Sequence, residues 1–165
     1  MQMYNIMEHS ELEKLLVNSI WIAQYGTLLA YQTINNISIP TSNQIIWIID
    51  SYKNGYVFGT SYTAIDKNSV LKTKIFGFII PNRSRNIQFS FRSDNNYIMY
   101  GSGELKKNDY GWQFLMQLYD TDNTSRGMNG PNQWLCMKPI TTHDREYYYL
   151  PIINISVPEL IALFC

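Results

Sequence analysis

Apolar and polar residues alternate along most of the chain, which is the period of a β-strand with one face buried. The clearest segment is Asn86–Arg92, where polar residues separate Ile87, Phe89 and Phe91. Comparable segments recur at fairly regular spacing, with short polar turns between them. Roughly eight such strands predict an all-β fold, an antiparallel up-and-down β-barrel, with a β-sandwich as the alternative.

One hairpin is predicted more sharply than the rest. In the stretch Gln44–Ile65, two apolar runs flank Asn54 and Gly55, the pair of residues that best forms a tight type I′ turn. The turn places Lys53 opposite Tyr56. Regular alternation back from the turn then predicts three aromatic rings on one face: Trp47, Phe58 and Tyr62.

Helices are predicted only near the two ends. Ser10 and Glu13 fit a capping box, which predicts a short helix over about residues 11 to 19. Ser156 and Glu159 repeat the pattern with Pro158 at the first turn, so a second short helix should extend through Leu163. The segment Val157–Cys165 is too apolar for water, so we expect it to contact a partner, form a homodimer or cover the barrel wall.

The 165 residues predict one domain, 1–165. Lys plus Arg and Asp plus Glu are 13 each, and this balance argues against a nucleic-acid partner and against an anionic membrane. Cys136 and Cys165 are too few for a disulfide framework. The first residues resemble no signal peptide, and we expect a soluble, cytoplasmic protein.

Catalytic chemistry is not indicated. His9 and His143 have no second ligand at metal-binding spacing, and no nucleophile or phosphate-binding motif accompanies them. We therefore expect no catalytic residues, no metal and no cofactor, and we favour a binding protein over an enzyme.

A barrel interior that is partly aromatic and partly Ser, Thr or Gln suits a small, partly apolar ligand. The irregular stretch Asp120–Asn132 would act as a lid over such a site. Arg83 and Arg85 lie in a short turn, where they would either hold an anionic group of the ligand or keep the barrel end soluble.

Two segments resemble the avidin and streptavidin family, within the wider lipocalin-like (calycin) group of small barrels. The segment Trp21–Leu29 is similar to that family's opening strand, Gly55–Tyr62 resembles a strand with Gly-Thr and tyrosine, and Trp134 with Leu135 resembles a late Trp-Leu pair. The resemblance implies polar cavity positions at Gln24, Thr27, Thr60 and Tyr62. Where that family cages biotin with tryptophan, Asn86–Arg92 carries phenylalanine.

The leading functional hypothesis is a non-enzymatic protein that holds a small ligand in the barrel mouth. The alternative is a protein-interaction module, an inhibitor or effector-type domain or a homo-oligomer, that uses the outer surface and the C-terminal segment. The predicted ligand-binding residues are Gln24, Thr27, Trp47, Phe58, Thr60, Tyr62, Arg83 and Arg85.

Overall fold

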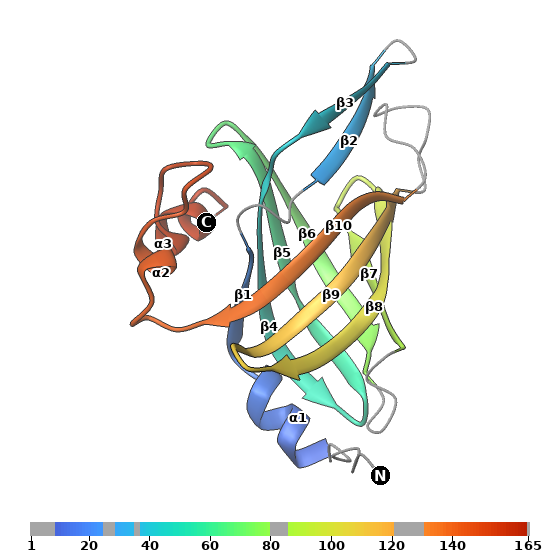
Figure 1. Cartoon of the computed structure of the whole chain (residues 1–165), viewed down its shortest axis with the longest axis vertical. Coiled ribbons are helices and arrows are strands. Elements are labelled where there is room, and N and C mark those ends of the chain that lie inside the picture. Colours follow the sequence, from blue (N-terminus) through green and yellow to red (C-terminus); the bar gives the residue numbers. More distant parts are fainter. Residues whose placement is uncertain (1–8, 25–28, 35–36, 80–85, 121–130, 165) are drawn as a thin grey trace.

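The structure is a computed structural model of the whole chain, and it describes residues 9–24, 29–34, 37–79, 86–120 and 131–164. Eight antiparallel strands form a closed barrel (Figure 1). In the order around the barrel they are β1 (Ser19–Ala23), β4 (Gln44–Lys53), β5 (Tyr56–Asp66), β6 (Ser69–Phe78), β7 (Ile87–Arg92), β8 (Ile98–Asn108), β9 (Gly111–Asp120) and β10 (Pro131–Ile140).

The barrel closes because β1 pairs with a neighbour on each side. Its residue Trp21 lies opposite Trp47 of β4 and opposite Pro139 of β10. Strands β4 to β10 each pair with the next one along the chain, so the predicted all-β, up-and-down barrel is confirmed. A hairpin of β2 (Leu29–Ile34) and β3 (Ile37–Thr41) extends the sheet beyond the barrel, because β2 pairs with the start of β10.

A β-bulge in β4 corrects the predicted hairpin register. Near the turn the pairing is as expected, with Ser51 opposite Phe58. The register then shifts at Asp50, so Trp47 lies opposite Ser61 and Tyr62 lies opposite Ile46. One extra residue moves every later side chain to the other face of the sheet. The predicted shared face of Trp47, Phe58 and Tyr62 is therefore wrong.

Aromatic side chains fill the middle of the barrel. The ring of Trp47 has no exposed surface, and its centroid lies 5.5 to 5.6 Å from those of Phe89, Phe91 and Phe114. Trp21 packs against Phe114 at 4.5 Å. These inward side chains come from β1, β4, β7 and β9, so the core ties together strands that are not neighbours.

The helix α1 (His9–Leu16) covers one end of the barrel. Its buried face carries Leu12 and Leu16, which join the interior core. His9 Nδ1 and the Tyr52 hydroxyl are hydrogen-bonded at 2.7 Å, and burial raises the pKa of Tyr52. The predicted N-terminal helix is confirmed in kind, although it begins before residue 11 and includes Ser10.

The C-terminal segment covers part of the outer wall. It contains α2 (Arg145–Tyr148) and α3 (Val157–Ala162), which lie beside β1, β4 and β5 (Figure 1). At the start of α3 the predicted capping box is present: the Glu159 amide donates to Ser156 Oγ, and the Ser156 amide donates to the Glu159 carboxylate. Val157 and Leu160 are fully buried against the wall.

Candidate functional site

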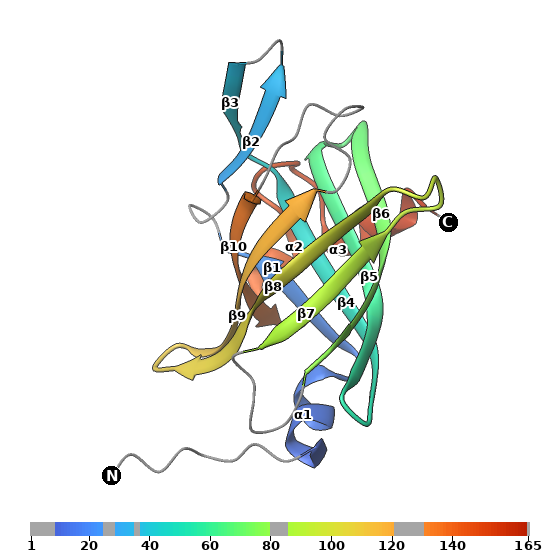
Figure 2. The same ribbon diagram turned by 90° about the vertical axis from the view of Figure 1, so that its right-hand side faces the viewer.

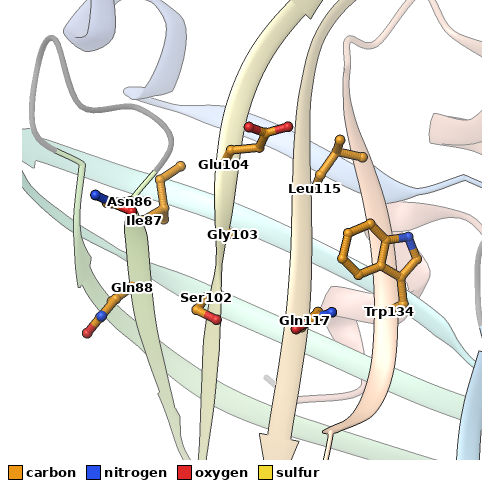
Figure 3. Close-up of a pocket in the computed structure, with 9 residues that line it drawn as sticks. All are labelled: Asn86, Ile87, Gln88, Ser102, Gly103, Glu104, Leu115, Gln117 and Trp134. Carbon is orange, nitrogen blue, oxygen red and sulfur yellow. The ribbon is translucent and has the colours of Figure 1, made fainter.

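A groove lies on the outer wall of β7 to β10. It has a volume of about 410 Å³. Four of its lining residues have uncharged polar side chains, and an indole lies at one border (Figure 3). Its lining residues are Asn86, Ile87, Gln88, Ser102, Gly103, Glu104, Leu115, Gln117 and Trp134.

Strand register brings these side chains together. Gln88 lies opposite Ser102, Ser102 opposite Gln117, and Gln117 opposite Trp134, so one row crosses four strands. Ser102 is the shortest side chain in this row, and the groove lies over it because its neighbours on β7, β9 and β10 are long. A side chain at Gly103 would collide with the Leu115 carbonyl oxygen, so the glycine is needed where β8 approaches β9.

The groove offers hydrogen-bonding groups that no other side chain uses. The Tyr119 hydroxyl donates to Gln117 Oε1 at 2.7 Å, which fixes this amide and leaves its Nε2 as a donor. Within the described residues, Gln88 and Ser102 make no side-chain hydrogen bond. Glu104 is the one ionisable side chain among the described lining residues, and it is 3.8 Å from Lys106 Nζ.

Trp134 supplies the apolar surface of the groove. Its side chain is 47% exposed, although a tryptophan of a barrel wall would normally be covered. Leu115, on the neighbouring strand, lies beside it in the groove (Figure 3). The arrangement is a flat aromatic surface next to amide and hydroxyl groups, which can bind an uncharged ligand that has one apolar face.

The structure does not bring the predicted ligand-binding residues together. Trp47 lies inside the barrel, whereas Phe58, Thr60 and Tyr62 belong to the outward face of β5. Tyr62 is buried on that outer side, with its ring 5.3 Å from the ring of Phe164. The register shift at Asp50 is the reason for this correction. Three further predicted residues lie outside the described residues: Thr27, Arg83 and Arg85. Residues 121–130, which make up nearly all of the predicted lid, also lie outside the described residues.

Gln24 borders a second, smaller cavity of about 150 Å³, between the outer wall and the C-terminal segment. Gln44 is also in its lining; this side chain is buried, and within the described part of the chain its Oε1 has no hydrogen-bond partner. The Cys136 thiol donates to Gln24 Oε1 at 3.4 Å, and burial raises the pKa of this thiol. At the border, Lys138 Nζ lies 2.7 Å from a Glu146 carboxylate oxygen, which joins β10 to α2.

The barrel interior becomes polar at the end opposite α1. Asn43 and Gln133 are buried there, and Gln133 Nε2 donates to Asn43 Oδ1 at 2.7 Å. Ser61 and Thr73 lie opposite each other on β5 and β6, and both are buried. Trp47 is the next inward residue of the core, and its Nε1 has no hydrogen-bond partner among the described residues.

Sequence reasoning missed the outer groove because its members are distant in the chain. In the sequence, Gln88 and Gln117 each occupy polar positions of an alternating segment. Gly103 is a glycine within a predicted strand, where a neighbouring backbone can approach closely. Only the successive pairing of β7 with β8, of β8 with β9 and of β9 with β10 shows that these positions share one row with Trp134.

Other chemistry is sparse in the part of the chain that the structure describes. No group of three or more His, Cys, Asp or Glu side chains is arranged to hold a metal ion there. None of the described helices has the length and apolar character needed to cross a bilayer. His143 is exposed in the turn after β10.

Comparison of the chain with protein-family models, curated proteins and solved structures gives no match.

Proposed function

We propose that this protein is a non-enzymatic binding protein whose ligand occupies the outer groove around Trp134. The ligand class is a small, uncharged molecule with one flat apolar face and several hydroxyl or amide groups, as in a neutral sugar. The supporting observation is a half-exposed indole beside the free Nε2 donor of Gln117 and beside Gln88 and Ser102, whose side chains make no side-chain hydrogen bond among the described residues.

Binding is favoured over catalysis by the groove's single ionisable group. General acid–base chemistry needs a second positioned acid or base, and Glu104 has none beside it among the described lining residues. Amides and a hydroxyl orient a ligand well, but they do not transfer protons at neutral pH.

The interior site predicted from the sequence is a weaker candidate. Three aromatic rings pack around Trp47, which leaves the polar end near Ser61 and Thr73 as the remaining interior location. We propose that the likeness to calycin barrels concerns the architecture, and that the ligand site has moved to the outside. The C-terminal segment is also a weaker candidate for a protein-interaction surface, because Val157 and Leu160 pack against the chain's own barrel wall.

Calorimetric titration with neutral mono- and disaccharides tests the proposal. We expect saturable binding to the wild-type protein, and a loss of at least about tenfold in affinity for Trp134→Ala, because one indole face carries most of the apolar contact. Gln88→Ala with Gln117→Ala should weaken binding further, because these amides would orient the hydroxyl groups.

Trp47→Phe is the matched control, since it alters an interior tryptophan and leaves the groove intact. If Trp47→Phe abolishes binding and Trp134→Ala does not, the ligand lies inside the barrel and the outer site is wrong. If no neutral sugar binds, the proposed ligand class is wrong.

A further inference from the structure

A second surface lies beside the groove on the same outer wall. Two neighbouring rows of outward side chains cross β5 to β8. One row has an aromatic ring on every strand except β7, where Ser90 lies, and the other has cations on β6 and β7. We call this surface the cation–aromatic face, and it consists of Phe58, Phe76, Tyr100, Lys74 and Arg92. Figure 2 looks onto this part of the barrel, where no described helix covers the strands.

The aromatic row is unusual for a wall that faces solvent. Phe58 is 43% exposed, Phe76 47% and Tyr100 50%, and register places Phe58 directly opposite Phe76. Their ring centroids are 5.3 Å apart. Tyr100 lies in the same row, with the short side chain of Ser90 between it and Phe76. Single exposed apolar residues need no explanation, but a group of them on one exposed surface marks a binding surface.

The cationic row is equally unusual. Lys74 lies directly opposite Arg92, and like charges in that position destabilise a sheet. Among the described residues neither side chain has an ion-pair partner. Arg92 donates to Asn96 Oδ1 at 3.0 Å, and the carboxylate of Asp94 is exposed in the turn that follows β7. Among the described residues, both positive charges therefore lack an acidic partner, although Arg92 is held by Asn96.

The two rows are in register with each other. Lys74 and Phe76 are two residues apart on one strand, so they share a face at a separation of about 6.6 Å. A ligand that fits both rows needs a planar ring and an anionic group a comparable distance from it. From this geometry we propose that the cation–aromatic face binds a nucleotide unit, its base stacked on the rings and its phosphate held by Lys74 and Arg92.

Single-stranded nucleic acid and free nucleotides share this chemistry. Proteins that bind single strands combine aromatic stacking surfaces with a positive track for the backbone, and that is the composition of this face. A duplex hides the faces of its bases and should bind less well. The balanced net charge led us to expect no nucleic-acid partner, yet it describes the whole surface, whereas these two cations act locally.

This inference does not rest on the proposed function. It concerns different side chains and a charged ligand, and it can hold if the groove binds no sugar. The exposed position also makes the face testable, because substitutions there leave the buried core unchanged.

The experiment is a fluorescence-anisotropy titration of the full chain with labelled short single-stranded DNA, at low and at raised salt. We expect binding that weakens with salt, with a slope of about −0.7 per phosphate contacted. Phe76→Ala with Tyr100→Ala should lower the affinity by about tenfold or more, through lost stacking. Competition by unlabelled UMP distinguishes a site for free nucleotides from a site for single-stranded nucleic acid. Effective competition indicates a free-nucleotide site, and weak competition indicates a site for a single strand.

Charge reversal is tested with a matched pair of variants. Lys74→Glu with Arg92→Glu should abolish binding, whereas Lys106→Glu with Lys107→Glu changes the net charge equally at the other end of the sheet and should retain most of it. Equal losses in both would show non-specific attraction and overturn the site. Unchanged affinity without the rings, tighter binding of a Glu- and Tyr-containing peptide, or no binding at all would each overturn it too. Thermal melts of all variants verify folding.

Discussion

The two halves of the barrel's outer wall are apolar in different ways. On β1 and β4 the outward residues include Ile22 and Ile46, and the C-terminal segment buries both of them. On β6 to β9 and at the start of β10 the outward residues include Phe76, Tyr100 and Trp134, and about half of each remains exposed. The first half is aliphatic and covered; the second is aromatic and bare.

This difference separates apolar surface that holds the fold together from apolar surface available to a ligand. The chain already supplies α2 and α3 to cover one half, so exposure on the other half is not a general property of this barrel. Aliphatic side chains gain most from full burial, whereas Tyr and Trp can interact with a ligand through one face while the other packs on the sheet.

The largest expected contrast is between Leu160→Ala and Phe76→Ala. Leu160 is fully buried under the covered half, and its truncation should lower the free energy of unfolding by about 2 to 5 kcal/mol. Phe76 is half exposed, and its truncation should cost about 1 kcal/mol or less. Urea unfolding followed by tryptophan fluorescence measures both. Similar losses for the two variants would mean that the bare half also serves stability.

A smaller effect concerns how the covering segment is attached. The hydrogen bond from Lys138 lowers the pKa of Glu146, and this pair joins β10 to α2. A carboxyl whose pKa is lower in the folded state stabilises the fold above its unfolded pKa, about 4.3, and loses that contribution as the pH falls.

Because both side chains are 33% exposed, we expect less than about 1 kcal/mol from the pair. Glu146→Gln should lower stability at pH 7 by this amount and flatten the dependence below about pH 4.3. Melting temperatures across acidic pH provide the measurement, with Glu104→Gln as the control on the bare half. An unchanged acid profile in Glu146→Gln would show that the ion pair does not hold the segment.

The smallest effect has the opposite sign. Arg92→Glu replaces a like-charge pair with an attractive one opposite Lys74, so stability should rise by about 0.2 to 1 kcal/mol. The same change should weaken oligonucleotide binding. A stabilised variant with reduced binding is the expected signature of a site maintained at the expense of stability, and a destabilised variant would contradict it.

Local signals in the sequence predicted the architecture well. The Asn54–Gly55 turn, the alternation at Asn86–Arg92 and the capping box at Ser156 all occur as expected. Each depends on residues close together in the chain, where backbone preferences decide the outcome. The number of strands in the barrel followed from counting them.

The candidate sites could not be predicted, because they depend on pairing between distant strands. A single extra residue at Asp50 placed Trp47 and Tyr62 on opposite faces of the sheet, so the predicted cavity wall does not form. In the structure, the inward residues of β4 are Ile45, Trp47 and Ile49 and then Tyr52, so the spacing is three residues at the bulge where two is regular. The groove and the cation–aromatic face each required the register of three neighbouring strand pairs.

The closing strand β1 has a consequence for how the chain folds. It forms four residue pairs with β4 and four with β10, whose partner residues lie near the far end of the chain. The hairpin of β8 and β9 forms ten pairs between residues that are close in sequence. Local hairpins form quickly and long loops close late, so the seam between β1 and β10 should be the slow step. Until it closes, Trp21 and the rings it packs against remain accessible to other unfolded chains, and aggregation during refolding should depend on how fast this one short strand finds its place.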